Sequence, residues 1–86
     1  MAKVIKIYAD WCGPCKLYAK TFNTVAEELK DEHEFSEVNI DKDTTGFAAK
    51  YKVSNIPATL IIKEDNRVNL VQGRLDKNAL IKLINT

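Results

Sequence analysis

This sequence lacks a dominant charge, a long apolar run and an export signal, and each absence argues against a class of protein. Its 13 lysines and arginines nearly balance 12 aspartates and glutamates, so the net charge of +1 provides no positive field for nucleic acid or anionic lipid. Apolar runs are short, as at 60–62, whereas a membrane-spanning helix needs roughly 20 residues. Lys6 interrupts the place where a signal peptide would be apolar. We therefore expect a cytoplasmic protein with neither nucleic acid nor membrane as a partner.

The length and composition fit one small globular domain. A chain of 86 residues is too short to divide into two units that each bury enough apolar surface. Hydrophobic residues make up 45% and charged residues 29%, a balance that argues against a disordered tail or a coiled coil. We expect a single domain over residues 1–86.

The spacing of apolar residues predicts the element order β-α-β-α-β-β-α, an α/β fold. We expect strands over 3–8, 35–40, 58–63 and 68–72, and helices from 14 to about 30, around 47–51 and from 77 to the end. Strands joined through a helix should be parallel with a right-handed crossover, and the last two strands should form an antiparallel hairpin. Asp43 or Thr44 is expected to cap the second helix and Asp76 the third, where Leu75 can pack on Leu80.

Both cysteines lie in one unit, Cys12-Gly13-Pro14-Cys15. A disulfide between them would close almost no loop and stabilise the fold little, so redox chemistry explains the pair better. The spacing of one helical turn can bring the two Cα atoms near the ~5.5 Å preferred by a disulfide. Pro14 suits the first turn of a helix, which places Cys12 at the helix N-terminus, where a thiolate is favoured. We expect Cys12 to be the nucleophile and Cys15 the resolving thiol.

A metal site is the alternative for this pair, because two cysteines at this spacing are also half of a zinc ligand set. A closed site needs four ligands, and His33, in a predicted solvated loop, is the only other good candidate. A non-catalytic metal-binding subunit would therefore need ligands shared between two chains.

Residues 9–16, Ala-Asp-Trp-Cys-Gly-Pro-Cys-Lys, resemble the active-site signature of thioredoxins. Asn39-Ile40-Asp41, Lys50-Tyr51, Ile56-Pro57 and Gly73 follow in thioredoxin order, so the resemblance covers almost the whole chain. It implies a minimal thioredoxin fold with sheet order 2-1-3-4 and a reductase of protein disulfides, recharged by a thioredoxin reductase, that needs no metal or organic cofactor. It also implies a cis peptide bond before Pro57. The substrate-binding residues implied are Trp11, Gly13, Pro14, Ile56, Pro57 and Gly73.

A glutaredoxin-like protein recharged by glutathione is a second enzyme class, which the short chain would suit. Against it, Gly-Pro separates the cysteines, and the stretch 73–76 has only one of the paired glycines that glutaredoxins usually place near glutathione.

The sequence departs from the thioredoxin pattern at its start, because the usual opening strand and helix are missing. One sheet face would then be covered only by the short second helix. This face is either a partly exposed apolar patch that binds a partner or, as we expect for a monomer, is covered by Phe47 and Tyr51. The residues expected to point to it are Ile5, Ile7, Val38 and Ile40.

A second departure concerns charge. Thioredoxins usually carry a buried aspartate on the strand before the active site and a lysine on the neighbouring strand, and these positions are Lys6 and Glu37 here. A buried charge without a partner would be costly, so we expect an ion pair beneath Cys15. Glu37 is predicted to take the proton of Cys15, and Lys6 to favour the thiolate. The alternative is a purely structural pair.

Overall fold

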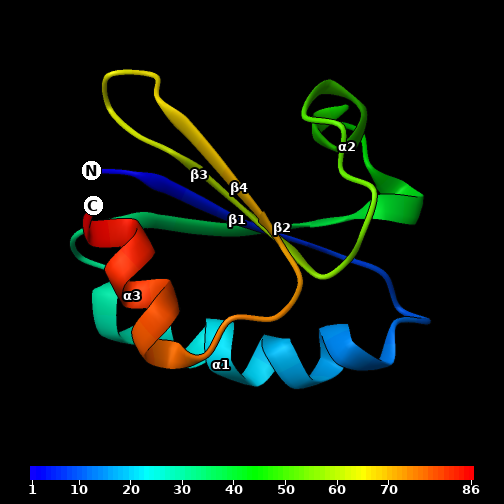
Figure 1. Ribbon diagram of the computed structural model, residues 1–86, viewed down its shortest axis with the longest axis horizontal. Coiled ribbons are helices and arrows are strands. Elements are labelled where there is room, and N and C mark those ends of the chain that lie inside the picture. Colours follow the sequence, from blue (N-terminus) through cyan, green and yellow to red (C-terminus); the bar gives the residue numbers. More distant parts are fainter.

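One mixed four-stranded sheet organises the computed structural model, which describes residues 1–86 (Figure 1). Its strands are β1 (Lys3–Tyr8), β2 (Glu34–Asn39), β3 (Ala58–Ile62) and β4 (Val68–Gln72). The strand order is β2-β1-β3-β4, with β1 parallel to β2 and the other two pairings antiparallel. The expected order and hairpin are confirmed, and β1 lies inside the sheet with partners on both sides.

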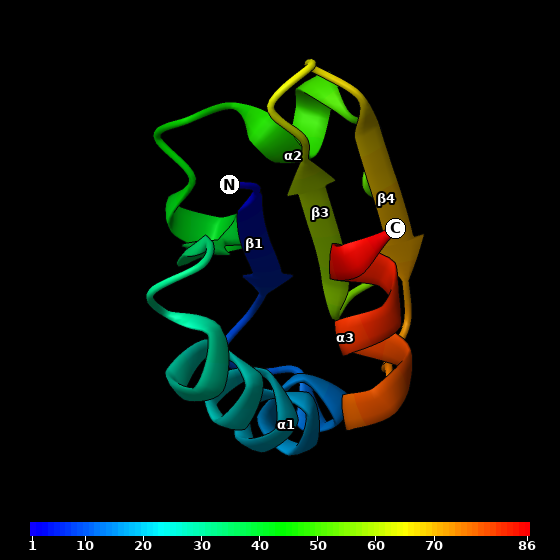
Figure 2. The same ribbon diagram turned by 90° about the vertical axis from the view of Figure 1, so that its left-hand side faces the viewer.

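Helices cover both faces of the sheet unequally. The helices are α1 (Gly13–Leu29), α2 (Phe47–Lys50) and α3 (Lys77–Asn85), together with a 3₁₀ turn, η1 (Ile40–Lys42), that the sequence did not predict. Figures 1 and 2 place α1 and α3 together on one face and α2 alone on the other. None of these helices combines the length and apolarity needed to cross a bilayer.

The alternation along β1 divides the core in two. Val4 points to the α1 and α3 face, where Tyr18, Phe22 and Leu80 are buried with it. Ile5 and Ile7 point to the α2 face. Because both faces of β1 are covered, its inner residues are all buried.

The α2 face is covered rather than exposed. Ile5, Ile7 and Val38 are buried there, and Phe47 and Tyr51 pack against them with their rings edge to face. The structure thus favours the covered alternative over an exposed partner patch. The expectation for Ile40 is wrong, because β2 ends at Asn39 and Ile40 enters η1, where it packs against Ala9 and the two cysteines.

The caps of the helices were predicted with mixed success. The residue before α2 is Gly46 with φ of 73°, so neither Asp43 nor Thr44 is its N-cap. The Asp43 carboxylate instead accepts hydrogen bonds from the backbone amides of Gly46 and Ala48. Asp76 caps α3 as expected, because its side chain accepts a hydrogen bond from the Ala79 amide at 2.8 Å.

The third strand ends one residue earlier than predicted, whereas the fourth has the predicted bounds. β3 stops at Ile62, and Lys63 begins the hairpin turn, where its amide donates to the Arg67 carbonyl. The Lys63 ammonium donates to the carbonyls of Leu83 and Ile84 at the C-terminal end of α3. A cation there is favoured by the helix dipole, so this side chain ties the hairpin to α3.

A buried hydrogen bond between Tyr18 and Thr59 gives a first prediction. The two hydroxyl oxygens lie 2.6 Å apart, and burial raises the pKa of Tyr18 although the bond to Thr59 acts against the rise. Tyr18→Phe leaves the Thr59 hydroxyl without this partner, so we expect a loss of about 1–2 kcal/mol in the free energy of unfolding near neutral pH.

The pH dependence of that variant has a definite sign. A folded-state pKa above the unfolded value, which is about 10, gives stability that is complete below that value and is lost as the pH rises through the folded pKa. Tyr18→Phe should therefore lose less stability than the wild type in alkali. Urea unfolding at neutral and alkaline pH measures this, with Tyr51→Phe as control in the other core. Equal alkaline losses in Tyr18→Phe and the wild type would contradict the prediction.

Candidate active site

The cysteine pair lies where β1 ends and α1 begins. A short turn joins the two elements, and in it the Cys12 amide donates to the Ala9 carbonyl at 3.2 Å. Pro14 lies in the first turn of α1, as the sequence predicted, although the helix begins one residue earlier than expected, at Gly13. The turn therefore places the first cysteine at the helix N-terminus.

The two cysteines form a disulfide with Cα atoms 5.2 Å apart. Cys12 is the N-cap residue of α1, and its Sγ accepts a hydrogen bond from the Cys15 amide at 3.2 Å. Both residues are buried, Cys12 at 5% and Cys15 at 2% exposure. After reduction, a sulfur anion on Cys12 faces this amide and the positive end of the helix dipole, whereas Cys15 lies a turn inside the helix.

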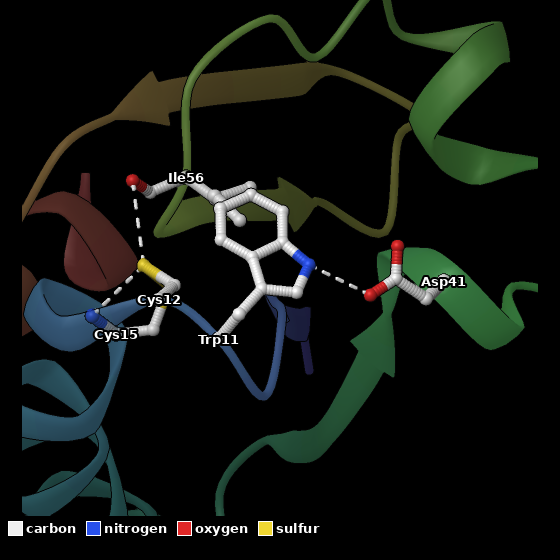
Figure 3. The surroundings of a disulfide bond; sticks show 5 residues. All are labelled: Trp11, Cys12, Cys15, Asp41 and Ile56. Carbon is white, nitrogen blue, oxygen red and sulfur yellow. Dashed lines mark hydrogen bonds between the residues drawn. A yellow bond between two sulfur atoms is a disulfide. The ribbon is translucent and has the colours of Figure 1, made fainter.

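The Ile56–Pro57 loop lies against Cys12. The peptide bond before Pro57 is cis, as the resemblance implied, and the Ile56 carbonyl oxygen lies 3.9 Å from Cys12 Sγ (Figure 3). The Pro57 side chain is buried, and its carbonyl accepts a hydrogen bond from the Gly73 amide at 2.7 Å. Gly73 has φ of 102°, which favours glycine over any other residue. The structure thus places Ile56 against Cys12, and it joins Gly73 to the neighbouring Pro57.

Trp11 is exposed beside the cysteine pair. The residue is 71% exposed, and its indole Nε1–H donates a hydrogen bond to Asp41 Oδ2 at 2.8 Å (Figure 3). The backbone amide of Asp41 in turn donates to the Asn39 side chain, which holds η1 in place. Sequence analysis missed this role of Asp41. The only signal was its place in a thioredoxin-like segment.

Lys6 and Glu37 form the expected ion pair. They are register partners on β1 and β2, and Lys6 Nζ lies 3.1 Å from Glu37 Oε2. The Lys6 side chain is 4% exposed and that of Glu37 55%, so the cation is buried while the carboxylate reaches solvent. The Lys6 ammonium also lies 5.0 Å from the ring centre of Tyr8 and 5.5 Å from that of Phe22. These rings supply cation–π contacts that help offset the cost of burial.

A cavity of about 170 Å³ joins this ion pair to Cys15. Lys6, Glu37 and Cys15 all line it, and so does Asp10, a second carboxylate whose position sequence analysis missed. Because Asp10 lies two residues before Cys12, only the folded turn shows that it faces the same space. The arrangement provides two carboxylates and one buried cation beside Cys15.

No group of three or more His, Cys, Asp or Glu side chains is placed to hold a metal ion. His33 is half-buried at the start of the sheet, where its Nδ1 accepts a hydrogen bond from the Ala2 amide at 2.9 Å. His33 thus lies in the loop after α1, as expected, but it is half-buried rather than fully solvated. The Ala2 amide lies just before β1 and His33 just before β2, and these parallel strands begin at the same end of the sheet.

Comparison with known proteins gives a consistent result. The family model described as Thioredoxin matches residues 1–86. A thioredoxin of Chlamydia caviae is 38% identical, with 95% of this chain and 78% of the relative aligned, and one of Chlamydia pneumoniae is 35% identical over the same shares. The X-ray structure of Fasciola hepatica thioredoxin superposes with a TM-score of 0.84 at 32% identity, covering 98% of this chain and 78% of that one.

Proposed function

The chain belongs to the thioredoxin family and is a protein thiol-disulfide oxidoreductase, and we propose that it works as a reductant of disulfides in other proteins. The observation that carries the proposal is the N-cap position of Cys12, whose sulfur faces the Cys15 amide at 3.2 Å. A thiolate stabilised there is a nucleophile, and its partner a turn away can release the product.

The proposed reaction has two exchange steps. The Cys12 thiolate attacks one sulfur of the substrate disulfide, the substrate S–S bond breaks, and the other substrate sulfur leaves as a thiolate that takes up a proton. Cys15, once deprotonated, attacks Cys12 Sγ and displaces the second substrate thiolate. Two electrons pass to the substrate, and the Cys12–Cys15 disulfide seen in the structure is the oxidised product.

An extended substrate segment is proposed to bind beside Cys12. The Ile56 backbone can pair with it as an added strand, since its carbonyl lies next to the attacking sulfur. Trp11 offers an exposed apolar ring on one side. The residues proposed to contact the segment are Trp11, Gly13, Pro14, Ile56, Pro57 and Gly73.

Glu37 is proposed to accept the proton of Cys15 during the second step, directly or through a water. Both residues line the same cavity, and Glu37 reaches solvent, so the proton can leave. Lys6, which is buried and lines the same cavity, favours the thiolate electrostatically and holds Glu37 in place.

Thioredoxins act on disulfide substrates, need no cofactor and are recharged by thioredoxin reductase. We propose that a thioredoxin reductase likewise recharges this chain, that the Cys12–Cys15 pair is its only redox group, and that it works as a monomer in the cytoplasm, where thiols are kept reduced.

The cysteine roles predict opposite outcomes for two substitutions. Cys12→Ser removes the nucleophile and should abolish insulin-disulfide reduction, whereas Cys15→Ser should still attack and accumulate a mixed disulfide with the substrate. Mass spectrometry of the trapped adduct locates the bond. Activity retained in Cys12→Ser, or an adduct on Cys15 in that variant, would contradict the assignment.

The role of Glu37 is tested in the second step alone. Glu37→Gln should slow release of the mixed disulfide by at least about tenfold near neutral pH, with recovery in alkali, where hydroxide deprotonates Cys15 directly. Stopped-flow measurement of product release across pH gives this rate. Asp10→Asn tests the other carboxylate of the cavity, and Glu34→Gln, at the exposed start of the same strand, is the control. A Glu37→Gln rate equal to the wild type at every pH would leave the ion pair structural.

The electron donor is tested by recycling assays run side by side. With thioredoxin reductase and NADPH the oxidised chain should be reduced rapidly, and glutathione at cellular concentration should reduce it far more slowly. The loss of Cys12–Cys15 disulfide over time is the measurement. Faster recycling by glutathione would favour the glutaredoxin-like alternative.

A further inference from the structure

A groove of about 340 Å³ opens between α1 and the connection from β4 to α3, outside the residues assigned above. One wall comes from the exposed side of α1 and the other from the chain just after Gly73. The residues that line it are Leu17, Tyr18, Thr21, Arg74, Leu75 and Asp76.

The α1 wall continues the helix face that begins at the cysteine pair. Gly13, Leu17 and Thr21 are spaced four residues apart, so they follow one another along one side of the helix. Leu17 is 56% exposed, and only Met1 and Trp11 among the large hydrophobic residues are more exposed. Its position offers an apolar contact to a chain that leaves the active site in this direction.

Arg74 supplies the charge of the opposite wall. It is exposed and takes part in none of the five ion pairs of the structure, whereas its cationic neighbour Lys77 is paired with Glu28. Asp76 lines the same groove, but its carboxylate is held by the Ala79 amide at the start of α3. Arg74 is thus a cation without a protein partner at the mouth of a groove.

A series of backbone contacts connects the groove to the redox site. Arg74 directly follows Gly73, whose amide donates to the Pro57 carbonyl at 2.7 Å, and the Ile56 carbonyl lies 3.9 Å from Cys12 Sγ. On the other side of the cysteines lie Asp10 and the Trp11 partner Asp41. Because β2 and β4 are opposite edges of the sheet, Arg74 lies on the β4 side only, whereas on the β2 side Asp10 shares its cavity with Lys6 and Lys16.

We propose that this groove docks the segment flanking the disulfide of the substrate protein and prefers an acidic residue there, read by Arg74. The proposal rests on the proposed function and adds a substrate class to it. A carboxylate placed toward β4 pairs with the free guanidinium, whereas toward β2 the Asp10 carboxylate already has Lys6 and Lys16 in its cavity. The preference for an acidic residue is therefore expected on the Arg74 side of the attacked cysteine.

Disulfide peptides of one sequence test this, with Asp, Asn or Lys placed in turn at each of three positions on either side of the attacked cysteine. For the wild type, kcat/KM should favour Asp over Asn by about threefold to fivefold at positions on one side only, the size expected of an exposed charge pair. High salt should remove the preference.

Arg74→Gln should bring the Asp to Asn ratio close to one, and Arg74→Glu should reverse it in favour of Lys. Arg67→Gln is the matched control, because Arg67 lies in the turn at the far end of the β3–β4 hairpin, paired with Asp65, and should leave the ratio as in the wild type.

Three outcomes would overturn the proposal. A wild-type ratio near one at every position, or a ratio that Arg74→Gln leaves unchanged, would refute the docking site while reduction of the Asn peptides upholds the proposed function. Failure to reduce any peptide would refute both.

Discussion

The hydrogen bond from the Cys15 amide to the Cys12 sulfur is the interaction on which the rest of the site depends. It makes a sulfur of the redox pair serve as a helix cap, so the start of α1 and the position of the Cys12 sulfur are set together. Since β1 is paired on both sides and its inner residues are buried, the point where the chain enters α1 is fixed by the sheet. The geometry of the redox pair is therefore a property of the fold rather than of a loop.

Beneath this pair, polar side chains cross the sheet in one row. Glu37, Lys6 and Thr59 are successive register partners on β2, β1 and β3, and Tyr18 of α1 closes the row through its bond to Thr59. A core filled with apolar side chains at these positions would avoid the cost of burying a cation. The row instead places a charge of fixed sign beside Cys15, opposite in sign to the aspartate usual in the family at the position of Lys6.

The sequence predicted those features that depend on local periodicity or on register. Apolar spacing was enough for the element order, whereas the Lys6–Glu37 pair was predicted from the resemblance to thioredoxins, which placed both residues on neighbouring parallel strands. The bonds of His33 and Asp41 were missed, since each joins segments about 30 residues apart whose approach no local pattern encodes. Ile40 was misplaced because it continues the apolar alternation of Val38, although β2 ends at Asn39 and Ile40 is the first residue of the 3₁₀ turn.

The unequal covering of the two sheet faces has a consequence for how the molecule opens. One face is sealed by two packed helices, whereas the other depends on the four residues of α2 and the loops around it. A unit with so few buried contacts separates from the sheet at a lower free energy than global unfolding requires. The Ile56 carbonyl beside the nucleophile belongs to that weaker unit. Transient local opening would thus displace Ile56 from the redox site while α1, which begins at the cysteines, stays folded.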